Sequence, residues 1–183
     1  MEKTRTYIDK GEEPRFFTVA PDVHDRVKPS EKKALLDLVA AAEVVVPRGN
    51  RAGISELVDT AAEDDQQSLY RVLWLEKDGR PMAVLGFGMV SATDDTYDCF
   101  GVAAASPEWA AKGLEALAKW MELAQARMMR FEVDTAHAAV AQSAEPFGYR
   151  EEGRLEDFYA DGVHQLLVFW RPGRKRPARP RES

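Results

Sequence analysis

The sequence predicts a mixed α/β domain in which about seven β-strands form one mixed sheet with helices on both faces. Three observations support this fold class. A strand, a long amphipathic helix and a second strand follow one another between Tyr97 and Val133, a two-strand hairpin precedes them, and further strands and helices are interspersed along the chain. Strands joined through a helix are typically parallel neighbours, whereas a hairpin contributes antiparallel ones, so the predicted sheet is mixed.

The long helix lies at the centre of this prediction. Tyr97–Ala105 is short, apolar and aromatic, as expected of a buried strand, and Phe131–Val133 is the next strand. Between them, Ser106 supplies an N-cap hydroxyl and Pro107 suits the first helical position. A helix that begins beside a strand end is a place where phosphate groups bind, so this junction is the first candidate site. Apolar residues recur at helical spacing along the helix: Leu114, Leu117, Met121, Ala124 and Met128.

The remaining elements are predicted from local patterns. Asp78-Gly79 is a strong hairpin-turn signal, and Gly148 suits the position that follows a helix end. The predicted strands cover Arg15–Ala20, Leu69–Glu76, Pro81–Val90, Tyr149–Phe158 and Val163–Trp170, and the predicted helices cover residues 30–43, 54–61 and 138–147.

Composition predicts one globular domain between two short terminal segments. The chain has 183 residues, of which 45% are hydrophobic and 31% are charged, as is usual for a single domain. We expect an N-terminal extension at residues 1–14, the domain at residues 15–171, and a basic, disordered tail at residues 172–183. The N-terminus has no signal-peptide pattern and no apolar run approaches a membrane span, so the expected location is the cytoplasm.

Charge and residue usage argue against several kinds of function. The net charge is −6 although the tail is basic, so the domain itself is acidic, and we expect neither nucleic acid nor a membrane as partner. Cys99 is the single cysteine, which excludes an internal disulfide, and its place in a buried strand favours a core role. His24, His137 and His164 show no metal-ligand spacing, so no metal site is predicted. A catalytic role is considered only for His137, because it follows the strand Phe131–Val133.

Several stretches resemble the GNAT acetyltransferase superfamily. In Phe147–Gly162 (FGYREEGRLEDFYADG), a Gly-Tyr pair leads from the last helix into a strand that ends in Asp-Phe-Tyr-x-x-Gly, as in that family. The run Asp95–Asp98 resembles a subgroup of the family, and Val102–Ala105 stands where Ile-Ala-Val is usual. The resemblance covers roughly Phe16 to Arg171. It implies a GNAT-like, splayed mixed sheet and an N-acetyltransferase that uses acetyl-coenzyme A.

The resemblance also implies where the cofactor would bind. The family's phosphate loop, Gln/Arg-x-x-Gly-x-Gly/Ala, corresponds here to the run Ala110–Glu115. Gly113 matches the loop and Lys112 is compatible with it, but Ala110 replaces the Gln/Arg and Glu115 replaces the last small residue. A carboxylate at that position would repel a pyrophosphate, so Glu115 and Ala110 argue against cofactor binding. The cofactor-binding residues that the resemblance implies are Ala103, Ala105, Ala111, Lys112, Gly113 and Leu114.

The catalytic positions of the family match less well. The tyrosine that protonates the departing thiolate in the family corresponds to the pair Ser143-Ala144. Ala144 has no proton to give, and Ser143 could donate a hydrogen bond. The general base on the fourth family strand corresponds to Asp98. The candidate catalytic residues are therefore Asp98 and Ser143.

Three hypotheses for function follow. The first is an attenuated N-acetyltransferase that moves an acyl group to a small-molecule or peptide amine, mainly by positioning the reactants. The second is a GNAT-fold binding or regulatory module that has lost acyl-coenzyme A binding. The third is a structural partner in a dimer or complex, and a homodimer stays open. The run Ala110–Glu115 and the residue Ala144 distinguish the first hypothesis from the other two.

Overall fold

The computed structural model of the chain describes residues 14–18, 29–62, 70–91 and 95–173. Almost all of the predicted N-terminal extension and of the predicted basic tail lies outside these residues. The strands are β1 (Pro14–Thr18), β2 (Val44–Val46), β3 (Tyr70–Lys77), β4 (Arg80–Ser91), β5 (Thr96–Ala104), β6 (Met128–Asp134), β7 (Tyr149–Ala160) and β8 (Val163–Trp170). The helices are α1 (Pro29–Ala41), α2 (Arg51–Ala62), α3 (Pro107–Leu123) and α4 (Ala138–Ala144), with short 3₁₀ turns η1 (Thr135–His137) and η2 (Glu145–Phe147).

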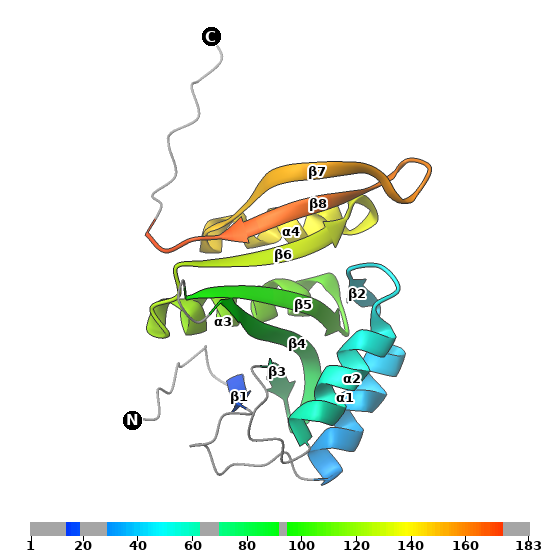
Figure 1. The fold of residues 1–183 in the computed structure, drawn as a ribbon. Helices are drawn as coiled ribbons and strands as arrows, with labels where there is room; N and C mark the ends of the chain where they lie inside the picture. The colour runs from blue at the N-terminus through cyan, green and yellow to red at the C-terminus, as the bar shows by residue number, and fades with distance from the viewer. Residues whose placement is uncertain (1–13, 19–28, 63–69, 92–94, 174–183) are drawn as a thin grey trace.

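Within the described residues, the strands form one eight-stranded sheet in the order β1-β3-β4-β5-β6-β8-β7, and β2 pairs with β5 off this path (Figure 1). The pair β5–β6 is parallel and the other pairs are antiparallel. The predicted mixed α/β sheet is therefore confirmed. Asp78 (φ 52°) and Gly79 (φ 72°) both have positive φ in the turn between β3 and β4, as the Asp-Gly signal predicts.

The helices cover both faces of the sheet. Figure 1 shows α1 and α2 on one face, over β3, β4 and β5, while α3 and α4 lie on the other. Each face has its own buried core, because successive side chains of a strand point to opposite sides. The α1–α2 core includes Leu35, Val39, Ile54, Val58, Val72 and Trp74. The α3–α4 core includes Leu85, Phe87, Leu114, Leu117, Phe131 and Trp170.

The two strands on either side of α3 are parallel neighbours, as predicted, but they pair over a short length. Thr96–Cys99 of β5 pairs with Met128–Phe131 of β6, and the two strands then diverge (Figure 1). The prediction that the strands before and after the long helix are adjacent and parallel is confirmed, although the pairing ends at Cys99 and Phe131, so Phe100–Ala104 does not pair with β6. Val102–Ala104 pairs with β2 instead, because β2 lies in the opening between the diverging strands.

One strand was not predicted, and the bounds of several other elements differ from the prediction. The strand β2 was not predicted, because a run of three valines between a helix and Pro47 is too short to show an alternation of apolar and polar residues. The strand β6 is longer than Phe131–Val133. The predicted helix over residues 138–147 divides into α4 and η2, where Pro146 stands in the first turn of η2 and Gly148 ends it with φ 99°.

Candidate functional site

The start of α3 decides whether the predicted phosphate loop exists. The helix begins at Pro107, and the Ser106 hydroxyl caps it by accepting from the Trp109 amide. The Ala110 amide donates to the Ser106 carbonyl at 3.1 Å. The run Ala110–Glu115 therefore lies inside α3, where each amide is engaged by the carbonyl one turn earlier.

Gly113 has a packing role in this helix. A Cβ built on Gly113 would lie 2.7 Å from Leu85 Cδ1 and 3.6 Å from Ala83 Cβ, both on β4. The glycine therefore lets α3 approach the sheet closely. Ala110 and Leu114 are fully buried beside it, so this face of the helix belongs to the core.

Charged side chains of α3 pair with one another. Lys112 Nζ lies 3.2 Å from Glu108 Oε1 and 4.5 Å from the centre of the Trp109 ring. Lys119 Nζ lies 2.6 Å from Glu115 Oε1. Glu115 is thus a helix-surface residue in an i,i+4 pair, not a residue of the first turn.

The end of β5 holds the other two positions assigned to the cofactor. Ala103 is fully buried and pairs with Val84 of β4 and Val45 of β2. Ala105 donates its amide to the Met82 carbonyl at 2.8 Å. The backbone at this strand end is therefore engaged by neighbouring strands.

The two candidate catalytic residues do not come together. Asp98 accepts a hydrogen bond from Arg130 of β6 at 2.5 Å, whereas Ser143 is an exposed residue of α4 that donates to the Val140 carbonyl at 2.7 Å. The neighbours of Asp98 in β5, Tyr97 and Cys99, face the α3–α4 core, so Asp98 points to the other face. The sheet lies between Asp98 and Ser143.

A polar cluster that includes Asp134 lies at the carboxyl end of β6. Asp134 is 0% exposed, its Oδ2 accepts from the Arg48 amide at 3.0 Å, and its carboxylate lies 2.9 Å from His137 Nδ1. His137 was considered from the sequence, but Asp134 was missed. The available signal was an acidic residue at a strand end with a histidine in the next turn.

Further polar residues adjoin this cluster on β6, β7 and β8. Gln165 is buried and donates to Glu132 Oε2 at 2.6 Å. Burial raises the pKa of Tyr159, and the nearby carboxylates of Glu132 and Asp134 raise it further. Chemically, the cluster offers a buried carboxylate that holds the orientation of a partly exposed imidazole.

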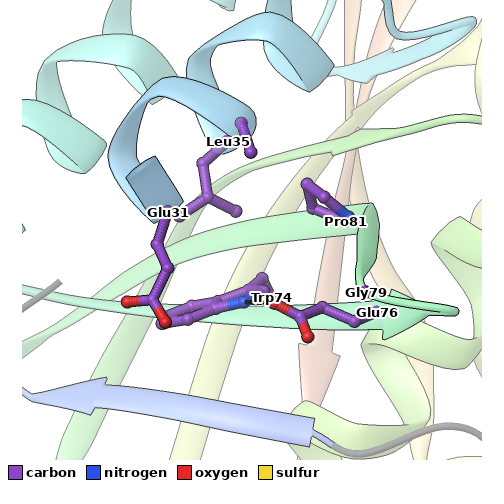
Figure 2. A pocket seen from close by; sticks show the side chains of 7 residues that line it. Glu31, Leu35, Trp74, Glu76, Gly79 and Pro81 are labelled. Carbon is purple, nitrogen blue, oxygen red and sulfur yellow. Dashed lines mark hydrogen bonds between the residues drawn. The ribbon is translucent and has the colours of Figure 1, made fainter. Parts of the chain in front are cut away.

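A pocket of about 180 Å³ lies between the start of α1 and the β3–β4 hairpin (Figure 2). The indole of Trp74 forms its floor, and Trp74 Nε1 donates to Glu76 Oε1 at 3.0 Å. Figure 2 shows the side chain of Glu31 reaching toward the indole from α1. The remaining lining residues are Ala34, Leu35, Gly79 and Pro81.

Cys99 is buried in β5 and is predicted to make the protein sensitive to alkali. Burial raises the pKa of its thiol from 9.0 to about 12. A raised folded-state pKa gives stability that is complete below the unfolded-state value and is lost as pH rises toward the folded-state value. We expect urea denaturation to give falling unfolding free energies between about pH 9 and pH 12. The slope should be smaller in Cys99→Ala, and an unchanged slope would contradict this assignment.

No group of three or more His, Cys, Asp or Glu residues suited to a metal ion occurs in the described part of the chain. In the same residues, no helix is long and apolar enough to span a membrane.

No protein-family model and no curated protein matches the sequence. Among solved structures, a protein from Desulfovibrio desulfuricans that is assigned to the GNAT acetyltransferases is similar with a TM-score of 0.68 and 19% identity, over 87% of this chain and 98% of that one. An N-acetyltransferase from Staphylococcus aureus is similar with a TM-score of 0.63 and 13% identity, over 87% and 98% of the two chains. An aminoglycoside 6'-N-acetyltransferase from Enterococcus faecium is similar with a TM-score of 0.58 and 13% identity, over 84% and 96%. The chain therefore has the fold of the GNAT acetyltransferase superfamily.

Proposed function

We propose that this chain is a GNAT-fold binding or regulatory module that does not use acyl-coenzyme A. The start of α3 at Pro107 is the observation that carries the proposal. Since the amides of Ala110–Leu114 are engaged in helical hydrogen bonds, they have no N–H groups to offer a pyrophosphate. The residues present at these positions do not fit the cofactor.

The residues Ser143 and Ala144, which correspond to the family's proton-donating tyrosine, are unsuited to that role, and this supports the same proposal. Ala144 has no ionisable group, and the Ser143 hydroxyl is bonded to its own helix. The nearby Tyr149 is buried, donates to the Leu114 carbonyl at 2.9 Å, and has a pKa raised well above its usual value by burial. Tyr149 therefore serves packing and is a poor general acid.

Calorimetric titration with acetyl-coenzyme A tests the proposal. We expect no saturable heat at ligand concentrations up to about 1 mM, which places any binding free energy above about −4 kcal/mol. An active GNAT enzyme titrated in parallel serves as the positive control. A dissociation constant in the low micromolar range would contradict the proposal.

One observation favours a second candidate, N-acyl transfer to an amine. Asp134 holds Nδ1 of His137, an arrangement in which the other ring nitrogen can accept a proton from an amine. If this candidate holds, transfer of the acetyl group from acetyl-coenzyme A to some member of an amine panel is measurable, with the coenzyme A thiol as the leaving group, and His137→Gln lowers kcat at least tenfold. If the unmodified protein transfers no acyl group to any amine of the panel, the candidate is rejected.

A further inference from the structure

The pocket between the start of α1 and the β3–β4 hairpin has an aromatic floor and apolar walls (Figure 2). The floor is the indole of Trp74, which is only 4% exposed and is held in the α1–α2 core. Ala34, Leu35 and Pro81 contribute apolar side chains to the lining. A cavity of about 180 Å³ is smaller than the pockets that hold drug-sized ligands, so it suits a single head group with a few further atoms.

Two carboxylates complete the lining of this pocket. Glu31 lies in the first turn of α1, and Glu76 stands two residues after Trp74, on the same face of β3. Trp74 Nε1 donates to Glu76 Oε1 at 3.0 Å, which fixes this carboxylate beside the floor. Figure 2 shows the two carboxylates at opposite ends of the indole. Both glutamates also have other interactions in the domain, but a carboxylate has about four acceptor positions and can take part in a further contact.

The charges around the pocket favour a cation as its ligand. None of the described residues that line the pocket is basic, whereas two of them are acidic. The negative face of an indole attracts cations as well. The chain has a net charge of −6, so its long-range field also attracts cations rather than anions. A bare calcium or magnesium ion fits less well than an organic cation, because these ions take six or more oxygen ligands.

The apolar walls distinguish between kinds of organic cation. A primary ammonium has three N–H donors, and each donor that faces an apolar wall would lose a hydrogen bond that it makes in water. A trimethylammonium group has no N–H donor, and its methyl groups can contact the side chains of Ala34, Leu35 and Pro81. Aromatic rings are the usual recognition surface for such quaternary groups. The lining therefore fits a methylated ammonium better than a primary one.

We propose that this pocket binds a small molecule with a trimethylammonium group, which lies over the indole of Trp74 and beside the carboxylates of Glu31 and Glu76. The binding is non-covalent, and a quaternary nitrogen has no electron pair with which to accept an acyl group. The pocket lies on the face of the sheet that α1 and α2 cover, whereas α3 lies on the other face (Figure 1). The inference thus goes beyond the proposed function, and titration with acetyl-coenzyme A does not decide it.

Titration of the unmodified protein with three small molecules, followed by ¹H–¹⁵N NMR, is the first test. Choline carries both the charge and the methyl groups, ethanolamine carries the charge alone, and 3,3-dimethyl-1-butanol has the shape of choline without its charge. We expect choline to give saturable shifts in the Trp74 indole N–H and in the amides of residues 76–80, with a dissociation constant of about 10 mM or below. Both other compounds should bind at least fivefold more weakly than choline. Choline shifts that do not saturate or that lie elsewhere, or an analogue that binds within fivefold of choline, would overturn the proposal.

A peptide of trimethyl-lysine between two alanines tests whether the ligand is a small molecule or a modified protein. If the pocket recognises the head group alone, the peptide binds no more than tenfold more tightly than choline. Binding that is more than tenfold tighter would overturn the assignment to a small molecule, because the peptide backbone would then contribute.

Two substitutions test whether the charge inside the pocket matters. Glu76→Gln and Glu43→Gln each remove one negative charge, but Glu43 is exposed and does not line the pocket. The glutamine at position 76 keeps an oxygen for the Trp74 indole. We expect Glu76→Gln to weaken choline binding at least fivefold and Glu43→Gln to weaken it less than twofold. Losses within twofold of each other would overturn the proposal, since choline would then respond to overall charge. Should Glu76→Gln not fold, Glu31→Gln takes its place with the same expected loss.

Discussion

Replacing Gly113 by valine is expected to lower the free energy of unfolding by about 3 kcal/mol. A Cβ at this position lies 2.7 Å from Leu85 Cδ1, and the branches of valine would extend further toward β4. Because Leu85 is fully buried, it has no free space into which to move. Urea denaturation followed by circular dichroism measures the change.

The matched control for Gly113→Val is Ala111→Val, on the same helix but at a half-buried position. That change should cost only about 0.5 kcal/mol, the propensity difference between the two residues. Equal effects of the two substitutions would show that Gly113 is not fixed by packing against β4. Similar losses of unfolding free energy from Gly113→Val and Ala111→Val are what we would expect if Gly113 belonged to an open phosphate loop.

Replacing Asp134 by alanine is expected to lower the free energy of unfolding by about 2 kcal/mol, because hydrogen bonds to a buried charged group are lost and a donor is left unpaired. The Arg48 amide would lose its acceptor, and His137 would lose the group that orients its ring. The same denaturation experiment measures the loss.

The control for Asp134→Ala is Asp37→Ala, which breaks the exposed pair of Asp37 with Lys33. Exposed pairs of this kind contribute about 0.5 kcal/mol or less. If Asp134→Ala were as mild as its control, the link between β6 and the segment after β2 would not stabilise the domain.

The sheet and most helices were predictable because their signals are local. A turn such as Asp78-Gly79 and an apolar stripe such as that of α3 depend on neighbouring residues alone. The β2–β5 pairing joins residues that lie far apart along the chain, and three valines have no pattern that identifies a partner. The resemblance to the GNAT superfamily implied a splayed sheet, but it did not predict that Val44–Val46 forms a strand beside β5.

The candidate site was less predictable than the fold. The sequence contained a helix-start signal at Ser106-Pro107, and the resemblance placed a phosphate loop further on, at Ala110–Glu115; in the structure α3 begins at Pro107. Glu115 therefore pairs with Lys119 on the helix surface, and its replacement by glycine would weaken a helix rather than open a loop. Contacts of Asp134 could not be read from the sequence, because one of its partners is the backbone amide of Arg48.

The proposed function requires that neither the start of α3 nor the end of β5 accepts acyl-coenzyme A. The most direct test is a ¹H–¹⁵N NMR titration of the unmodified chain with acetyl-coenzyme A, which locates binding as well as detecting it. If the chain is a module that does not bind the cofactor, we expect no saturable shift in the amides of Val102–Ala105 or Ser106–Gly113 at ligand concentrations up to about 1 mM. Saturable shifts in either segment would contradict it, since the cofactor would then bind at the start of α3 or at the end of β5.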